Sequence, residues 1–467
     1  MKLRNCILCL LFISAFTAQA EVKLPALFAN GMVLQQKTNV KIWGFSTGKK
    51  SIRIKTSWDH KTYQVKPLEN GNWQTLLATP SAGGPYSINI DQENKIILSD
   101  VLIGEVWVCS GQSNMDMPVK GYGGLPITNS IDILMDAPNP NLRLFHVEKA
   151  FSATPKSDVK GSWEQADASS ASTFSAVGYQ FANFLQKHLG VPVGIIQTTW
   201  GGSPIEAWTD KIVIENLLGD RLTSDRAISK ANHQTPGNLY NAMVKPIIGY
   251  NIAGVIWYQG EQNRHNHQDY LALQMAMVNL WRKEWGIGAW SFYGVQLAPM
   301  DYGKEPALSV PLLREAQLKL ADTLENSGMA ISIDAGEEHN IHPANKTVVA
   351  KRLAYLALAK TYHKNGIAFS GPRYQSMQVK QDTVTVKFSG IPLGMTAYGT
   401  KITQFEVAGN DKVFHPALAK IKDNKVILVS AEVKQPVAVR YAFKDWCVGE
   451  LYSVEGLPAS PFRTDDW

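Results

Sequence analysis

The sequence predicts an α/β protein in which a parallel sheet, covered by helices on both faces, is flanked by two β-rich regions. Between residues 101 and 368, continuous apolar runs alternate with helical patterns, which is typical of βαβ units. On either side of this stretch, short β-branched and aromatic runs are bounded by Gly, Asn, Asp and Ser, which indicates all-β structure. We therefore expect an N-terminal all-β domain at 21–100, a central α/β domain at 101–368 and a C-terminal β-rich segment at 369–467.

The first 20 residues have the pattern of a secretory signal peptide. Lys2 and Arg4 precede an apolar core from Cys6 to Phe16, and an A-x-A cleavage site ends at Ala20. The apolar run is too short to span a bilayer. We therefore predict cleavage after Ala20, a secreted or periplasmic location and no insertion into the membrane.

The composition is that of an ordinary globular protein, with 45% hydrophobic and 18% charged residues in a chain of 467. The formal net charge is only +6, and no dense Lys/Arg run predicts nucleic-acid binding. Only Cys109 and Cys447 lie outside the predicted signal peptide, too few for a disulfide framework or a zinc site. We expect them to be two separate buried thiols, although a disulfide between them is the alternative.

The predicted elements follow one another in a regular order. The N-terminal strands are expected at 39–45, 51–58, 61–68 and 84–91. Five buried strands are expected at 101–110, 191–203, 253–260, 291–299 and 329–336, and helices at 176–190, 239–249, 269–286, 310–324 and 345–362. After about residue 370, strands are expected at 374–390, 402–409, 425–433 and 438–443.

Polar segments follow four of the predicted parallel strands. They are "SGQSNM" (110–115), "TTWGGS" (198–203), "YQGEQN" (258–263) and "DAGEEHNIHPANK" (334–346). Because ligands of open parallel sheets bind beyond the carboxyl ends of the strands, these segments should converge on one edge.

The residue types in these segments suit acyl transfer. Ser113 is a candidate nucleophile if His342 takes its proton as general base. The backbone N–H groups of Ser113 and of Gly201 or Gly202, with the side-chain amide of Gln259, could form an oxyanion hole. Because Met115 occupies the last glycine position of G-x-S-x-G, the α/β-hydrolase fold is disfavoured.

The ordered blocks resemble the sialate O-acetylesterase family of carbohydrate esterases, within the SGNH hydrolase superfamily. The blocks that carry the resemblance are "GEVWVCSGQSNM", "WGGSPIEAW", "LYNAMVKPI", "GVIWYQGEQN", "VQLAP", "LREAQ", "IHPANK" and "GLPASPFRTD". The resemblance spans nearly all of the chain after residue 20. It implies an SGNH-type three-layer α/β/α domain with accessory β domains, Ser113 as nucleophile, His342 as base, and no metal or other cofactor.

One position departs from the pattern of such hydrolases. They usually carry an Asp three residues before the histidine, where it orients the imidazole, and this chain has His339 there. Glu338, Glu337 or Asp334 could supply the orienting acid. The alternative is a Ser-His dyad assisted by a backbone carbonyl.

Structural interpretations stand beside the catalytic ones. Ser113 could cap the helix that follows it, and His342 could simply precede a helix. Arg264 and Asn263 are candidates for substrate binding, with Asn263 also a rival to Gln259. His265 and His267 are interpreted as exposed loop residues because no third ligand lies at a suitable spacing.

The predicted function is that of a secreted serine esterase that removes O-acetyl groups from sugars, with 9-O-acetyl sialic acid as the favoured substrate. The alternatives are an esterase for acetylxylan or another polysaccharide, and a catalytically weak glycan-binding relative. The expected partner is an acetylated sugar or glycan, whereas the sequence makes no prediction about oligomeric state.

Overall fold

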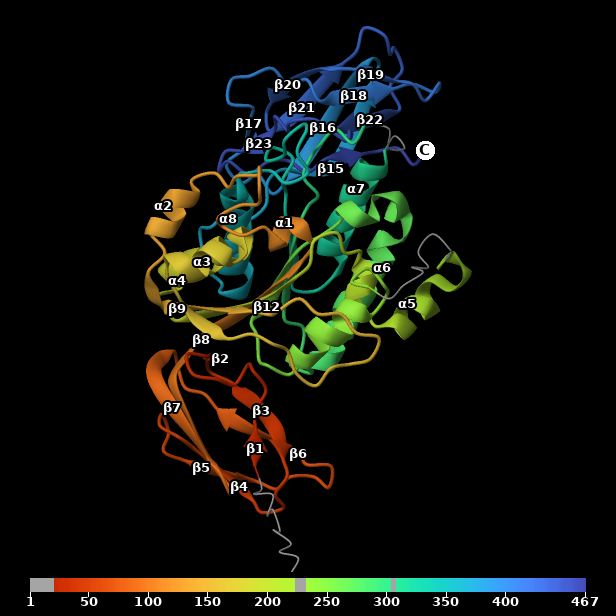
Figure 1. Cartoon of the computed structure of the whole chain (residues 1–467). Coiled ribbons are helices and arrows are strands. Elements are labelled where there is room, and N and C mark those ends of the chain that lie inside the picture. Colours follow the sequence, from red (N-terminus) through yellow and green to blue (C-terminus); the bar gives the residue numbers. More distant parts are fainter. Residues whose placement is uncertain (1–20, 223–231, 304–307) are drawn as a thin grey trace, which may run out of the picture.

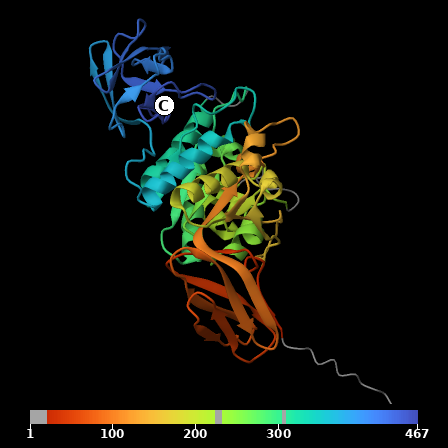
Figure 2. The same ribbon diagram turned by 90° about the vertical axis from the view of Figure 1, so that its left-hand side faces the viewer.

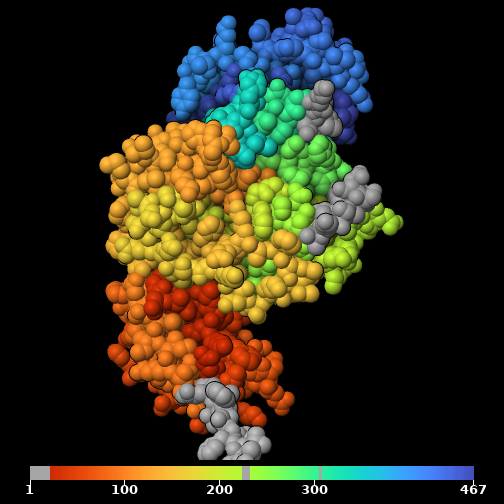
Figure 3. Space-filling model, in the orientation of Figure 1, coloured from red at the N-terminus to blue at the C-terminus, as the bar shows by residue number. Residues whose placement is uncertain are grey.

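The computed structural model of the chain describes residues 21–222, 232–303 and 308–467. The predicted signal peptide, residues 1–20, lies outside the described residues. Three parts follow one another along the long axis of the molecule, namely an N-terminal β region (21–94), a central region (95–372) and a C-terminal β region (373–467) (Figures 1 and 2). In the space-filling view the two β regions lie at opposite ends of the central region (Figure 3).

The N-terminal β region consists of short strands that pair antiparallel, except β2, which pairs parallel with β8. Its strands are β1 (Val22–Lys23), β2 (Val33–Gln35), β3 (Asn39–Ser46), β4 (Ile52–Thr56), β5 (Thr62–Val65), β6 (Asn72–Ala78) and β7 (Gly83–Asp91). One sheet has the order β1-β3-β6, and in the other β4 pairs with β5 and β7. Within β4, Ile52, Ile54 and Thr56 are buried while Arg53 and Lys55 between them are exposed, which is the alternation of a strand with one face on a core.

A single long strand, β8 (Lys95–Gly111), belongs to both the N-terminal and the central region. Its first half pairs antiparallel with β7, and its second half pairs parallel with two strands of the central sheet. The predicted boundary at 100/101 therefore lies inside one continuous strand. The division of the chain into three domains stays a prediction.

The central sheet is parallel, as predicted, but one edge strand that the sequence did not predict is antiparallel. Its other strands are β9 (Asn139–His146), β10 (Trp163–Ala166), β11 (Val193–Thr199), β12 (Gly254–Tyr258), β13 (Ser291–Val295) and β14 (Ser327–Ala330). The strand order is β10-β9-β11-β8-β12-β13-β14, and only β10 runs antiparallel to its neighbour. All residues of β11, β12 and β13 are buried, because helices cover both faces.

Alternate residues of the central strands pack into two separate cores. Trp107 and Cys109 of β8 face the core that contains α4 (Ala176–Leu189) and α8 (Lys346–Leu356). Val106 and Val108 face the core that contains α6 (His267–Trp285) and α7 (Ser309–Thr323). This is a three-layer α/β/α arrangement, so the predicted fold class is confirmed.

Shorter helical segments connect these elements. The α-helical ones are α1 (Ser113–Asp116), α2 (Ser130–Met135), α3 (Ala168–Thr173) and α5 (Lys211–Leu218). The 3-10 segments are η1 (Ile205–Trp208), η2 (Gly219–Arg221), η4 (Lys245–Ile247) and η5 (Glu261–Asn266), and the π-helical ones are η3 (Tyr240–Val244) and η6 (Ala357–Thr361). The helix expected at 239–249 is thus irregular, because Pro246 provides no backbone N–H and obstructs a regular α-helical turn.

The C-terminal β region forms small antiparallel sheets. Its strands are β15 (Arg373–Lys380), β16 (Thr383–Ser389), β17 (Met395–Thr396), β18 (Phe405–Ala408), β19 (Phe414–Pro416), β20 (Leu418–Lys422), β21 (Lys425–Val429), β22 (Ala438–Tyr441), β23 (Tyr452–Ser453) and β24 (Phe462–Arg463). The buried Arg314 guanidinium of α7 donates to the carbonyls of Lys444 and Asp445, which ties this region to the central one.

Two expectations about single features can be compared directly with the structure. Cys109 and Cys447 are buried free thiols, as expected. Within the described residues, every helix is too short or too polar to cross a lipid bilayer.

Candidate active site

Ser113 is the first residue of α1, two positions after the carboxyl end of β8. Gly111, the last residue of the strand, has φ +135°, and a Cβ there would overlap the carbonyl of Tyr258, so the turn requires glycine. The next residue, Gln112, is buried and donates its backbone N–H to the Tyr258 carbonyl at 3.0 Å. Its side-chain oxygen accepts the N–H of Gln262 at 3.2 Å. The turn is therefore fixed on both sides, while Ser113 itself stays partly exposed.

The turn Gly201–Gly202 follows β11, the strand beside β8, and faces Ser113. A Cβ added to Gly201 would lie 3.4 Å from the Cβ of Ser113, so the two backbones are close neighbours. Gly202 has φ +70°, and its carbonyl accepts a hydrogen bond from Gln234 Nε2 at 2.9 Å. Within the described residues, the backbone N–H groups of Ser113, Gly201 and Gly202 donate to no other residue. These N–H groups are available to an incoming oxygen atom.

Gln259 and Asn263 lie behind this turn with their side chains fully buried. Both amide hydrogens of Gln259 are used, since Nε2 donates to the Ser203 carbonyl at 3.2 Å and to Asn263 Oδ1 at 2.7 Å. Asn263 Nδ2 in turn donates to Glu206 Oε2 at 2.8 Å. Neither amide is free in this conformation. These contacts do not show Gln259 as an oxyanion donor or Asn263 as a substrate ligand. Both roles stay predictions.

His342 lies on the loop between β14 and α8, and hydrogen bonds within this loop hold its conformation. The backbone N–H of His342 donates to Asn340 Oδ1 at 2.9 Å. Glu337 accepts from Asn340 Nδ2 at 2.9 Å and from the Ala344 N–H at 2.6 Å. The ring of Tyr122 packs edge-on against the imidazole, with centroids 6.1 Å apart. Burial and, to a lesser degree, the positive charge of Lys346 lower the pKa of His342 from its ordinary value of 6.5.

The three candidates for the orienting acid have other partners. Asp334 makes two hydrogen bonds with Arg352, at 2.6 and 2.7 Å, and Glu337 holds the loop backbone. Glu338 lies 3.9 Å from the exposed side chain of His339. In the part of the chain that the structure describes, no carboxylate forms a hydrogen bond or ion pair with the His342 ring. This arrangement favours a Ser-His dyad, and the identity of the third group remains a prediction.

Asp116, in the turn after Ser113, organises the side of the site next to His342. It is buried and accepts hydrogen bonds from Thr199 Oγ1 at 2.6 Å, Lys149 Nζ at 2.8 Å and the Tyr122 hydroxyl at 3.0 Å. Tyr122, which packs against His342, is therefore itself anchored. Sequence reasoning missed this group, although Asp116 lies within the same segment as Ser113.

A second group that sequence reasoning missed connects the Ser113 turn, the segment after β12 and the His342 loop through buried side chains. Asn114, next to Ser113, is buried and donates through Nδ2 to Glu261 and to the Ile341 carbonyl, the latter at 2.9 Å. Its Oδ1 accepts from Lys346 Nζ. Both Asn114 and Lys346 belong to motif blocks that the sequence displays, so their position in these blocks was the available signal. Glu261 is itself buried.

The remaining candidates lie at the edge of the site or outside it. The Arg264 guanidinium packs over the ring of Tyr302 at 4.3 Å and also contacts the Glu261 carbonyl, so its charge is partly covered. His267 Nδ1 lies 3.1 Å from the Arg264 carbonyl. Among residues 21–222, 232–303 and 308–467, no three His, Cys, Asp or Glu side chains cluster as metal ligands would.

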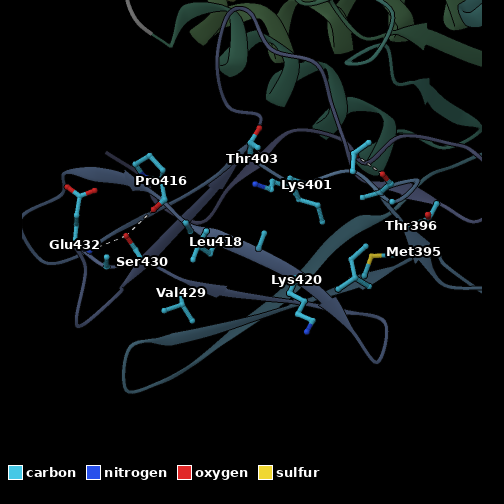
Figure 4. A pocket seen from close by; sticks show the side chains of 18 residues that line it. Met395, Thr396, Lys401, Thr403, Pro416, Leu418, Lys420, Val429, Ser430 and Glu432 are labelled. Carbon is cyan, nitrogen blue, oxygen red and sulfur yellow. Dashed lines mark hydrogen bonds between the residues drawn. The ribbon is translucent and has the colours of Figure 1, made fainter.

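A separate cavity of about 970 Å³ lies in the C-terminal β region (Figure 4). Lys401, Lys420 and Glu432 are on its wall, together with aliphatic residues such as Leu418. None of its 18 lining residues is aromatic, so it lacks the flat ring on which a sugar could stack. Near Ser113, by contrast, Trp200 stacks on His233 with ring centroids 5.0 Å apart, directly before the Gly201–Gly202 turn.

Comparison with known proteins gives consistent results. Residues 103–359 match the family described as "carbohydrate esterase, sialic acid-specific acetylesterase". The crystal structure of a carbohydrate acetylesterase from Xanthomonas citri is 35% identical, with a TM-score of 0.86 over 96% of this chain and 100% of that one. The sialate O-acetylesterase of Pongo abelii is 27% identical over 93% of this chain and 90% of its own length. The human sialate O-acetylesterase is 28% identical over 75% and 73%, respectively.

Proposed function

The chain belongs to the carbohydrate esterase family of sialic acid-specific acetylesterases and is a carboxylic ester hydrolase, and on this premise we propose that it removes O-acetyl groups from sialic acid through Ser113 and His342. The observation that carries the proposal is the position of Ser113. It is partly exposed at the end of the central strand β8, opposite Gly201, among backbone N–H groups without partners in the described part of the chain.

The proposed reaction has two steps. The Ser113 oxygen attacks the acetyl carbonyl carbon while His342 takes the hydroxyl proton, and the N–H groups of Ser113, Gly201 and Gly202 stabilise the oxyanion. The bond from carbon to the sugar oxygen then breaks, and the sugar leaves with the proton from His342. Water attacks the acetyl-enzyme with His342 again as base, the bond from the acetyl carbon to the Ser113 oxygen breaks, and acetate is released while Ser113 takes the proton back from His342.

The lowered pKa of His342 supports its role as the base. Because a base must be unprotonated to accept the proton of Ser113, a pKa below 6.5 keeps His342 active at neutral and mildly acidic pH. Its ring is unpartnered by any carboxylate of the described residues, which supports a dyad. In the absence of substrate the hydroxyl and the imidazole need not be hydrogen-bonded, since such contacts often tighten only when substrate binds.

The substrate is proposed from the names of the relatives. The mammalian relatives are sialate O-acetylesterases, whereas the Xanthomonas citri relative is described as a carbohydrate acetylesterase. We therefore propose 9-O-acetyl sialic acid as substrate, with acetylated polysaccharide as the second candidate. We further propose secretion, supported by the pattern of residues 1–20.

Ser113→Ala and His342→Ala test the mechanism. Each should abolish acetate release from 4-nitrophenyl acetate and leave the circular-dichroism spectrum unchanged, while Ser169→Ala, at an exposed serine, is the matched control. Retained hydrolysis by Ser113→Ala contradicts the assignment of the nucleophile. Acetate release from 9-O-acetyl sialic acid, compared with acetylated xylan, decides between the two substrate classes.

A further inference from the structure

The structure contains a buried polar group that the proposed reaction does not use directly. It consists of Asn114, Glu261 and Lys346, whose side chains are all nearly inaccessible to solvent. Each comes from a different segment, respectively the turn after β8, the segment after β12 and the first residue of α8. Burying an ammonium and a carboxylate is unfavourable unless both are paired and hydrogen-bonded, so this group has a structural or functional reason.

The Asn114 carboxamide connects the two charges. Its N–H₂ group faces the Glu261 carboxylate, and its carbonyl oxygen faces the Lys346 ammonium, so the polarity of each end matches its partner. An aspartate here would place a carboxylate against that of Glu261. Asparagine is therefore the side chain of this shape that satisfies both neighbours.

The same carboxamide also connects the backbones next to the two proposed catalytic residues. Asn114 directly follows Ser113, and its Nδ2 donates to the carbonyl of Ile341, the residue before His342, at 2.9 Å. Lys346 begins α8, four residues after His342. One side chain thus fixes the serine turn against the histidine loop.

Resting on the function proposed above, we propose that Asn114, Glu261 and Lys346 form a positioning unit that fixes His342 relative to Ser113, and that the Lys346 ammonium keeps the imidazole in its neutral, basic form. A positive charge close to an imidazole disfavours a second one, because the two cations would repel each other in a poorly solvated site. The carboxylate of Glu261 favours the charged form of that ammonium, which predominates below a pH of about 7, in the range where the imidazole titrates.

The pKa directions agree with this arrangement. Burial lowers the pKa of Lys346 to about 7, while Glu261 and Glu337 act in the opposite direction. Lys346 lowers the pKa of His342, whereas burial raises that of Glu261. Titratable and charged groups surround His342 on three sides. Lys346 lies on α8, and Glu261 lies behind Asn114. Tyr122 packs against the imidazole, with Asp116 and Lys149 behind it. The loop of His342 itself carries Glu337, Glu338 and His339.

Lys346→Met in the full chain tests the electrostatic part of the proposal. The expected result with 4-nitrophenyl acetate is a kcat reduced about tenfold or more and an acid limb of the pH profile moved upward by about half a pH unit or more. Lys351→Met, which removes an exposed lysine from the same helix, is the control and should leave both unchanged. An acid limb at the same pH in Lys346→Met overturns the electrostatic role.

Asn114→Asp tests the positioning part and does not depend on the folding of the lysine variant. It keeps the shape of the side chain but removes the donor to Ile341, so kcat should fall about tenfold or more with KM nearly unchanged. Wild-type kcat in this variant overturns the positioning unit. Failure of the proposed function itself is recognised separately, because Ser113→Ala or His342→Ala would then retain hydrolysis.

Discussion

Replacing either glycine of the Gly201–Gly202 turn by alanine should affect activity at one position and stability at the other. At Gly201 the backbone does not need a positive φ, and the new methyl group would meet Ser113 Cβ at 3.4 Å and Cα at 3.7 Å, which are ordinary contacts. Gly201→Ala should therefore fold. The methyl group, however, occupies the space in which the acetyl carbonyl would approach the backbone N–H groups.

The expected loss for Gly201→Ala follows from the value of one oxyanion donor. Alanine keeps the backbone N–H, but its methyl group keeps the acetyl oxygen from reaching that donor. Losing such a hydrogen bond costs about 2.7–4 kcal/mol in the transition state, so kcat/KM should fall by about 100-fold or more. Gly202→Ala meets no crowding but has φ +70°, where a side chain costs about 1–2 kcal/mol. The melting temperature of Gly202→Ala should therefore fall, by about 2–4 °C or less for each kcal/mol of lost stability in a chain of this size.

The assay combines kcat/KM for 4-nitrophenyl acetate with the melting temperature from scanning calorimetry. Gly201→Ala should lose activity at an unchanged melting temperature, while Gly202→Ala should melt earlier. Gly190, which has φ +68° at the end of α4 far from the site, provides a matched control, since Gly190→Ala should lower only the stability. Full activity in Gly201→Ala would refute the reasoning about the oxyanion hole.

Three further predictions concern His342, His339 and Arg314. On acidification, kcat/KM should fall with an apparent pKa below 6.5, because burial and the charge of Lys346 lower the pKa of His342. An apparent pKa above 6.5 in the measured pH profile contradicts this. His339→Asp should change kcat by no more than about twofold, since among the described residues the exposed side chain has only Glu338 as an ion-pair partner. A large increase would instead show that the missing aspartate limits the enzyme. Arg314→Met should destabilise the protein by about 3 kcal/mol, because the buried Leu297 carbonyl and the partly buried carbonyls of Lys444 and Asp445 lose their donor. An unchanged calorimetric melting temperature would contradict the stabilising role.

The central sheet could be predicted because burial on both faces leaves a direct trace in the sequence. The strands β8, β11 and β12 are largely apolar where they cross the sheet, and such a run between turn residues is typical of a strand with both faces covered. The strand β9 was missed because half of it is polar, and its Arg143 is buried only through an ion pair with Asp100, 43 residues away. A contact at that separation leaves no local pattern.

The convergence of loops at one edge could also be predicted, since parallel strands end on the same side. The state of each side chain in those loops could not. In the sequence Gln259 resembles a free amide, but its partners come from Ser203, Asn263 and Tyr270, and only the packed structure reveals that they use both ends. His339 similarly occupies the position of an expected acid by spacing, yet its side chain is exposed. Spacing along the chain gives the location of a residue but not the direction of its side chain.

The continuity of β8 has a consequence for the synthesis of the protein. At about 3.3 Å per residue, this 17-residue strand extends for about 56 Å. The N-terminal half finds β7 as soon as residue 103 has left the ribosome, but the other half waits for β11 and β12, which end at residues 199 and 258. During that interval a completed β-sheet carries an unpaired apolar extension, which is a ready template for aggregation. We expect the nascent chain to depend on chaperone protection over this window of about 150 residues, and the β-rich N-terminus to be the first part to gain resistance to protease.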